Sequence, residues 1–331
     1  PKGVSWFIIE KGTKGLTVDK HEDKHGIRLS DTCPINMQDV YVPIENLVGG
    51  VEGKGLRQAQ AVFGYTRLMV AAMALGTGWK AIEHAVRYSQ QRNVGGQPLC
   101  TKQGMTHKLL VPFAARLEAA RAFVEEVARR IDSGEEGLQT EGAIAKLLAS
   151  ETADTACNNA IQAYGGNGYV REFPVEKIKR DIKITCIYEG TSEILELTTF
   201  RQRWQDNINA DGRYYDKIAE DMDALHAKGP DVGAAAAAAA SRALSRVLQA
   251  CYDQKLTSNQ IAHMKLGELM CYAETAAAFC REAAKDTLSE AVIFDQETWR
   301  AMCRIHAGHT AAWIASEGLS LVAGCSEVDV M

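Results

Sequence analysis

The chain has 331 residues, of which 46% are hydrophobic and 24% charged, a composition typical of globular proteins with more than one domain. The formal net charge of −5, without clusters of Lys and Arg, argues against a nucleic-acid partner. Nine cysteines without a CxxC pair indicate reduced thiols and argue against a zinc site or a disulfide framework.

The first part of the chain, residues 1–52, is predicted to form β structure. Residues 4–9 form an apolar run typical of a buried strand, and shorter strand patterns follow at residues 16–18 and 35–42. Gly, Pro, Asn and Asp separate the three. Because a sheet of so few strands seldom stands alone, this region is expected to be one part of a β-domain.

From residue 65 onwards the hydrophobic period becomes helical. Apolar stripes cover residues 65–92 and 109–134, a third helix is expected from Thr140 to Gly165, and a fourth after Thr191. Short loops between long amphipathic helices favour an antiparallel four-helix bundle over residues 53–208. Further helical segments at 214–226, 234–256, 258–285 and 297–322 predict a helical extension, residues 209–331, so that the whole is mainly α. The extension is acidic, which is a poor match to an anionic membrane surface.

One short motif offers acid–base chemistry. Glu189 stands directly before Gly190, and the hydroxyls of Thr191 and Ser192 can cap a following helix. A carboxylate there could take a proton from a weak carbon acid, while the Gly190 N–H could hold the oxygen on which charge develops. On these residues alone, a capped helix start with an ordinary surface Glu explains the motif equally well.

Four other motifs accompany it at fixed places in the chain. They occupy residues 88–92, which end at Arg92, the Gly-rich stretch 162–169, residues 173–177, and the pair Arg180 and Asp181. In order and spacing the five motifs resemble the acyl-CoA dehydrogenase flavoenzymes, over about residues 4–203. The resemblance implies FAD-dependent α,β-dehydrogenation of an acyl-CoA to the trans-2-enoyl-CoA, with electrons passed to an electron-transfer flavoprotein. It also implies a cytoplasmic enzyme in a bacterium or a mitochondrial-matrix enzyme in a eukaryote.

The resemblance assigns the catalytic roles. The family's matching glutamate, here Glu189, takes the α-proton, and the N–H matching Gly190 holds the thioester oxygen. Some family members place the base elsewhere, at the position that is Thr66 here, just before Arg67. Since that position carries no carboxylate, Glu189 is the expected base. The substrate side is expected to include Tyr65, Arg67, Tyr188 and Arg201, although a structural ion pair is an equally open role for the two arginines.

Cofactor contacts are implied in the same way. Residues matching Arg92, Gln103, Gln162 and Gly166 contact an FAD held mainly by the neighbouring subunit, whereas those matching Thr191 and Glu193 contact the flavin of their own subunit. A homodimer or a dimer of dimers is therefore expected. Taken alone, the turn at Gly165 and Gly166 is also an ordinary helix stop. Two departures from the family pattern, Gly95 where a Phe is usual and Glu196 where a polar or basic residue is usual, leave the local contacts open.

Two alternatives to a dehydrogenase remain open at this stage. A non-catalytic partner subunit could keep the fold and complete another chain's site, and an acyl-CoA oxidase would share every motif. Because the resemblance places the start of the chain inside the family's β-domain, we expect the N-terminal half to come from the same or another polypeptide. We also expect residues 1–331 alone to be poorly soluble or to lack flavin.

Overall fold

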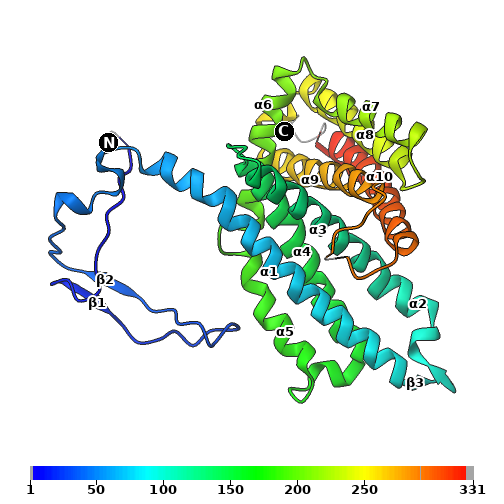
Figure 1. Ribbon diagram of the computed structural model, residues 1–331, viewed down its shortest axis with the longest axis horizontal. Helices are drawn as coiled ribbons and strands as arrows, with labels where there is room; N and C mark the ends of the chain where they lie inside the picture. Colours follow the sequence, from blue (N-terminus) through cyan, green and yellow to red (C-terminus); the bar gives the residue numbers. More distant parts are fainter. Residues whose placement is uncertain (1–2, 291, 326–331) are drawn as a thin grey trace.

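An extended N-terminal arm, residues 3–54, projects from a helical body in the computed structural model, which describes residues 3–290 and 292–325 (Figure 1). Within the arm, β1 (Leu16–Val18) pairs antiparallel with β2 (Ile35–Met37), with Leu16 opposite Met37. Short 3-10 turns follow at Ile44–Asn46 and Val48–Gly50. A small β region ahead of the helices is thus confirmed.

The strand predicted at residues 4–9 is wrong. This segment makes one antiparallel bridge, Phe7 opposite Leu47, and its side chains are not buried, with Val4 54% and Ile8 61% exposed. An apolar run becomes a strand only where a neighbouring chain offers a ladder of hydrogen bonds. The part of the chain that the structure describes offers this run a single pair, and β2 likewise ends at Met37 instead of residue 42.

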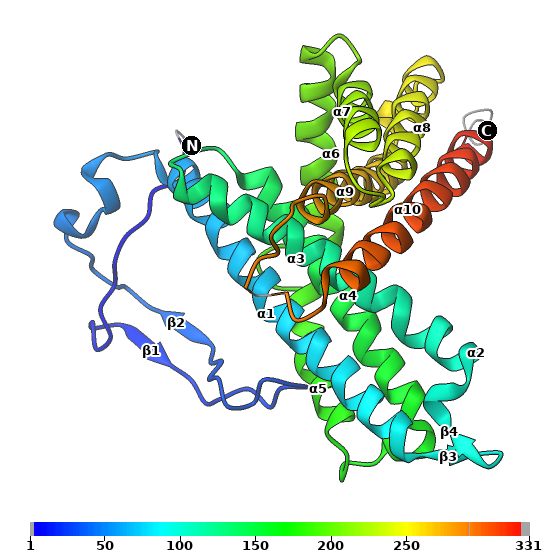
Figure 2. The same cartoon turned by 45° about the vertical axis from the view of Figure 1, so that its right-hand side comes forward.

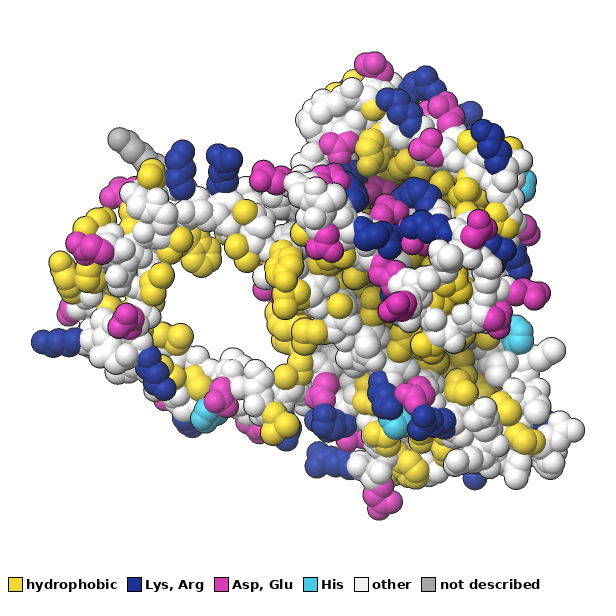
Figure 3. Space-filling model, in the orientation of Figure 1, with side chains coloured by type: hydrophobic (Ala, Val, Ile, Leu, Met, Phe, Trp, Pro, Cys, Tyr) yellow, Lys and Arg dark blue, Asp and Glu magenta, His cyan; other side chains and the backbone are white. Residues whose placement is uncertain are grey.

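The arm touches the helical body at two places. Near its start, Trp6 Nε1 donates a hydrogen bond to the Gly55 carbonyl oxygen at 2.8 Å. Near its middle, the Ile27 N–H donates to Asp181 Oδ1 at 2.8 Å, and Arg180 donates to the His25 carbonyl oxygen at 3.1 Å. Between these contacts an opening separates arm from body, and hydrophobic side chains gather on both of its sides (Figure 3).

The body begins with the predicted bundle. Its long helices are α1 (Gly55–Gln91), α3 (Val111–Asp132), α4 (Gln139–Tyr164) and α6 (Ser192–Asn209). The short elements between them are β3 (Asn93–Val94), β4 (Gln97–Pro98), α2 (Gln103–Met105) and α5 (Pro174–Ile182). Helix α1 starts ten residues earlier than its apolar stripe, because its first turns are mostly exposed and show no stripe.

Small residues let the bundle helices approach closely. A Cβ on Gly142 of α4 would lie 2.4 Å from the Gly64 carbonyl oxygen of α1, and one on Gly78 would lie 2.9 Å from Ala153 Cβ. Alanines of α1, α3 and α4 fill much of the core beside Leu117, Phe123 and Ile144. A core of such small side chains fixes how the helices cross, because larger ones would push them apart.

The extension forms four further helices, as predicted. They are α7 (Tyr214–Lys228), α8 (Ala234–Asp253), α9 (Gln260–Ala283) and α10 (Gln296–Cys325). Helix α9 lies on α3 and α6 of the bundle, while α10 packs on α3, α8 and α9 (Figure 2). The alanine run that opens α8 is buried at Ala234, Ala237, Ala238 and Ala240. Among the described residues, no helix is both long and apolar enough to cross a membrane.

A buried ion cluster joins bundle and extension. Arg203 of α6, 5% exposed, donates two hydrogen bonds to the Glu274 carboxylate of α9, at 2.8 and 3.0 Å. It also contacts Glu141 of α4 and Asp206, each at 3.0 Å. The Tyr215 hydroxyl of α7 donates to Glu274 at 3.1 Å. Four helices thus share one buried cation.

Candidate functional site

The turn before α6 has an unusual backbone. Glu189 and Gly190 both lie at positive φ, 57° and 99°, and Thr191 then caps α6 by accepting a hydrogen bond from the Ile194 N–H at 3.4 Å. A Cβ on Gly190 would lie 3.1 Å from Leu195 Cδ2, a tight contact, but the positive φ is the main reason for glycine at this position. Non-glycine residues at positive φ store strain of order 1 kcal/mol and are enriched at functional sites.

Two neighbouring residues of α1 hold this turn. The Thr66 hydroxyl donates to Glu189 Oε2 at 2.9 Å, and Arg67 Nε donates to the Glu189 carbonyl oxygen at 3.1 Å. The residue at the family's alternative base position therefore hydrogen-bonds the carboxylate at the other position. Burial lowers the pKa of Arg67, and the nearby Glu189 charge partly offsets that effect. The half-buried carboxylate is thus fixed in direction from α1.

Lys146 of α4 completes the support and was missed by sequence reasoning. Its side chain is fully buried, and Nζ donates to the Gly190 carbonyl oxygen at 2.7 Å. Burial lowers the pKa of Lys146 to about 8. The available signal was one charged residue inside the apolar run 143–149 of a predicted helix, because lysine is almost never buried without a specific partner. In the described chain, no acceptor pairs with the Gly190 N–H itself.

A second group of predicted residues meets at the other end of α1. Arg92, Gln162, Gly165 and Gly166 line one hollow of about 330 Å³, whose wall includes the stacked Tyr88 and Tyr164 rings. Gly165 has φ 61° and ψ −139°, a conformation open essentially only to glycine. A Cβ on Gly165 or Gly166 would meet nothing within 4 Å, so a ligand can approach the backbone closely on that side, although the Gly165 N–H itself donates to the Gln162 carbonyl oxygen. Gln103 does not line this hollow.

The predicted substrate residues are only partly brought together. Arg67 and the half-buried Tyr188 adjoin the Glu189 turn, and burial, followed by the Glu189 charge, raises the pKa of Tyr188. Tyr65 is 57% exposed and lines a separate hollow beside the α3–α4 loop. Arg201 is exposed on α6. The structure therefore supports substrate contact for the first two more directly than for Tyr65 and Arg201.

Glu193 lies in an acidic hollow of about 360 Å³ between α3, α4, α6 and α9. Glu151, Glu196 and Glu268 line the same hollow. Burial, reinforced by the Glu268, Glu193 and Glu151 charges, raises the pKa of Glu196 to about 7. The departure noted at Glu196 in the sequence is therefore a carboxyl group that is partly protonated near neutral pH.

Replacing Glu196 with Gln is expected to stabilise the protein at pH 8 by about 1–2 kcal/mol, after allowance for partial solvent exposure. The folded-state pKa of about 7 exceeds the unfolded value of 4.5, so deprotonation between these values costs stability in the wild type. Urea unfolding of both proteins from pH 4 to 8 measures the difference, which should be near zero at pH 4 and level off above pH 7. A difference independent of pH would contradict the assignment.

Comparison with known proteins shows what this chain is similar to. Residues 53–202 match the family described as "Acyl-CoA dehydrogenase, C-terminal domain". The chain is 43% identical over 197 residues to the short-chain specific acyl-CoA dehydrogenase of Megasphaera elsdenii, covering 60% of this chain and 51% of that protein. The chain thus spans about half the length of the curated relatives it matches.

Two solved structures extend the comparison. One, described as an electron transferring flavoprotein of Acidaminococcus fermentans, is 37% identical with a TM-score of 0.58, covering 61% of this chain and 52% of the other. The other, an acyl-CoA dehydrogenase complexed with FAD from Bacillus anthracis, is 22% identical with a TM-score of 0.78. The match covers 97% of this chain and 59% of the Bacillus anthracis chain, so the similarity in fold includes the helical extension.

Proposed function

We propose that the protein containing this chain, whose residues 53–202 match the acyl-CoA dehydrogenase C-terminal domain, oxidises an acyl-CoA thioester to the trans-2-enoyl-CoA. The observation that carries the proposal is the Glu189 carboxylate, held by Thr66 one residue before the Gly190 N–H, which has no acceptor in the part of the chain that the structure describes. Glu189 removes the α-proton, and the Gly190 N–H donates to the thioester oxygen as negative charge develops there.

Residues around the turn keep this geometry in place. Thr66 and Arg67 orient Glu189 from α1, and Lys146 holds the Gly190 carbonyl from α4. Within the described residues the Gly190 N–H has no acceptor and is free to donate to a ligand. One hydrogen-bond donor placed in this way is typically worth about 3–4 kcal/mol in the transition state. FAD, when bound, accepts the β-hydrogen as hydride. The name of the Acidaminococcus structure supports an electron-transfer flavoprotein as the next acceptor.

The functional test is anaerobic mixing of the flavin-loaded protein with butyryl-CoA, chosen because the Megasphaera relative is short-chain specific. Loss of flavin absorbance with formation of crotonyl-CoA is the expected result. Rapid reoxidation by air, without an electron-transfer flavoprotein, would identify an oxidase instead. No bleaching by acyl-CoAs of any chain length would exclude both enzymes and leave the non-catalytic partner subunit.

The length of α1 favours an assembly of at least two copies. Thr66, beside Glu189, and Arg92, at the end of the helix, lie about 39 Å apart at 1.5 Å per residue. This separation is too large for one FAD to reach both groups in one chain. Thr191 and Glu193 would then serve the flavin of their own subunit, while Arg92, Gln162 and Gly166 would serve that of the neighbour, with Gln103 close by in sequence to the same hollow.

Replacing Arg92 with Ala should therefore release FAD and weaken the dimer together. Among the described residues its guanidinium is the one cation lining the glycine-turn hollow, and it is suited to a pyrophosphate. Flavin absorbance and sedimentation velocity measure the two effects. Arg87→Ala is the matched control, since Arg87 lies on the exposed face of α1 and pairs with Glu83. Full flavin occupancy with unchanged sedimentation would show that Arg92 is a surface residue.

The arm supports a further part of the proposal. Its side chains include exposed apolar residues: Trp6, Phe7, Ile8, Val18, Ile35, Met37, Tyr41 and Ile44. Exposed apolar patches of this kind mark surfaces that another polypeptide covers. We therefore propose that the N-terminal half of the enzyme, from the same or another chain, packs in the opening between arm and α1 (Figure 3).

A further inference from the structure

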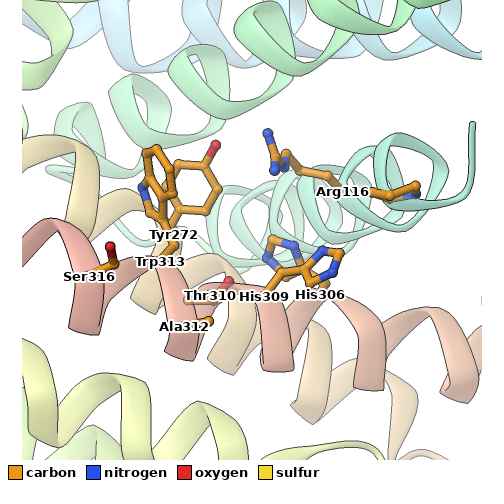
Figure 4. Close-up of a pocket in the computed structure, with 9 residues that line it drawn as sticks. Arg116, Tyr272, His306, His309, Thr310, Ala312, Trp313 and Ser316 are labelled. Atoms are coloured by element: carbon orange, nitrogen blue, oxygen red, sulfur yellow. The ribbon is translucent and has the colours of Figure 1, made fainter. Parts of the chain in front are cut away.

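A pocket separate from the Glu189 turn lies between α3, α9 and α10. It has a volume of about 320 Å³, and its lining includes Arg116, Tyr272, His306, Thr310 and Trp313. This volume is at the small end of the range for small-molecule sites. The rings of Tyr272 and Trp313 form one side of the pocket, and the Arg116 side chain extends over it from α3 (Figure 4).

The floor of this α3–α9–α10 pocket carries buried polar atoms without partners. His306 and Thr310 are 3% and 1% exposed, and in the described chain neither His306 Nε2 nor Thr310 Oγ1 makes a hydrogen bond. Both side chains come from α10 and face the same space as Arg116 (Figure 4). Burying such atoms unpaired costs free energy, so the pocket contains binding capacity that the described chain leaves unused.

The charges of the residues that line the α3–α9–α10 pocket indicate which kind of ligand it could bind. The Arg116 guanidinium lies over the Phe113 and Tyr272 rings, at 5.4 and 5.2 Å. It also borders the hollow that holds Glu193, but within the described residues no carboxylate forms an ion pair with it. Burial, followed by the charges of Arg116 and His309, lowers the pKa of His306 to about 3, so its imidazole is neutral and can donate one hydrogen bond. The pocket therefore presents the unpaired Arg116 guanidinium together with the hydrogen-bonding groups of His306 and Thr310.

The remaining lining is mostly apolar and aromatic, with Pro112, Ala312, Tyr272 and Trp313 around the polar floor. An inorganic anion would leave these surfaces uncovered, whereas an anion with an apolar body would cover them. We propose that the α3–α9–α10 pocket binds a small organic carboxylate, with Arg116 pairing with the carboxylate and Thr310 and His306 hydrogen-bonding from the floor. Tyr272 and Trp313 pack on the apolar part of that ligand.

This pocket shares no residue with the Glu189 turn or the glycine-turn hollow, although Arg116, Tyr272 and Trp313 also line the neighbouring Glu193 hollow. Isothermal titration of the protein with benzoate and with inorganic phosphate tests it. We expect one benzoate per chain, and phosphate binding at least about tenfold weaker because it covers no apolar surface. Equal affinity for the two anions would overturn the ligand class, and absence of benzoate binding at millimolar concentration would overturn the site.

Variants locate the binding. Arg116→Gln should weaken benzoate binding about tenfold or more, Arg116→Lys less, and Thr310→Val several-fold. Arg246→Gln, in a different hollow between α6, α7 and α8, is the matched control and should bind as the wild type does. Nitrogen-15 spectra of the His306 ring should shift with benzoate in the wild type. Unchanged affinity in Arg116→Gln, with thermal unfolding showing it folded, would refute the assignment.

Discussion

Replacing Glu189 with Gln is expected to lower the rate of flavin reduction by acyl-CoA between about 10²- and 10⁴-fold, the usual contribution of a positioned general base. The Gln side chain can still accept the hydrogen bond from Thr66, and the backbone contacts of Arg67 and Lys146 do not involve the carboxylate. Folding and flavin content should therefore be unchanged. Anaerobic stopped-flow absorbance with butyryl-CoA gives the rate directly.

The matched control is Glu83→Gln, which removes a carboxylate from the outer face of α1, where it pairs with Lys80 and Arg87. That variant should reduce its flavin as fast as the wild type. If Glu189→Gln also did so, another residue would have to be the base, and Glu189 would be a strained structural residue at the start of α6.

The second large effect is expected at the junction of bundle and extension. Arg203→Met should lower the free energy of unfolding by about 3–5 kcal/mol, because Glu274 would remain buried without its cation and Glu141 would keep only its longer contact with Arg130. Burial opposes the charge on Arg203, but Glu274, Tyr214 and Glu141 together raise its pKa above the usual value. Urea unfolding followed by circular dichroism measures the loss.

Arg281→Met provides the comparison for Arg203. Arg281 joins the same two parts of the molecule through Glu126, but this pair lies at the surface, with Arg281 42% exposed. Its removal should cost less than about 1 kcal/mol. Equal losses for the two variants would show that the buried cluster contributes no more than a surface pair.

The helices, which make up most of the fold, could be predicted from their hydrophobic periodicity. The strands could not be predicted reliably from the pattern of their residues. Stripes such as Leu68, Leu75 and Ile82 mark a helix that buries one face whatever its partner, so the helices of bundle and extension could be found from the sequence. An apolar run such as residues 4–9 becomes a strand only beside another strand. Its state therefore depends on chain segments that the run itself does not specify.

In the candidate site, too, some residues could be predicted from the sequence and others could not. Glu189 and Gly190 could be identified from the sequence because their motif is local. Gly165 and Gly166 could be identified because a turn at the end of a helix favours glycine. The contacts of Lys146 and Thr66 could not be predicted, because both depend on how distant helices pack against the turn. Lys146 of α4 lies 44 positions from its partner in the sequence, and Thr66 of α1 lies 123 positions from its partner. A buried lysine in an apolar run signals a partner, but the sequence does not say which.

The contact between α3 and α10 also affects how the chain folds while it is being synthesised. Trp299 of α10 donates to Glu118 Oε2 of α3 at 2.8 Å across 181 positions, and Ala119 and Ala122 of α3 are buried in a cluster with Trp299. At about 5–20 residues per second, a ribosome needs roughly 10–35 s between these positions. During that interval the bundle displays an uncovered, carboxylate-bearing face on α3. The nascent chain is therefore most exposed to aggregation and proteolysis after its bundle has formed and before α10 emerges.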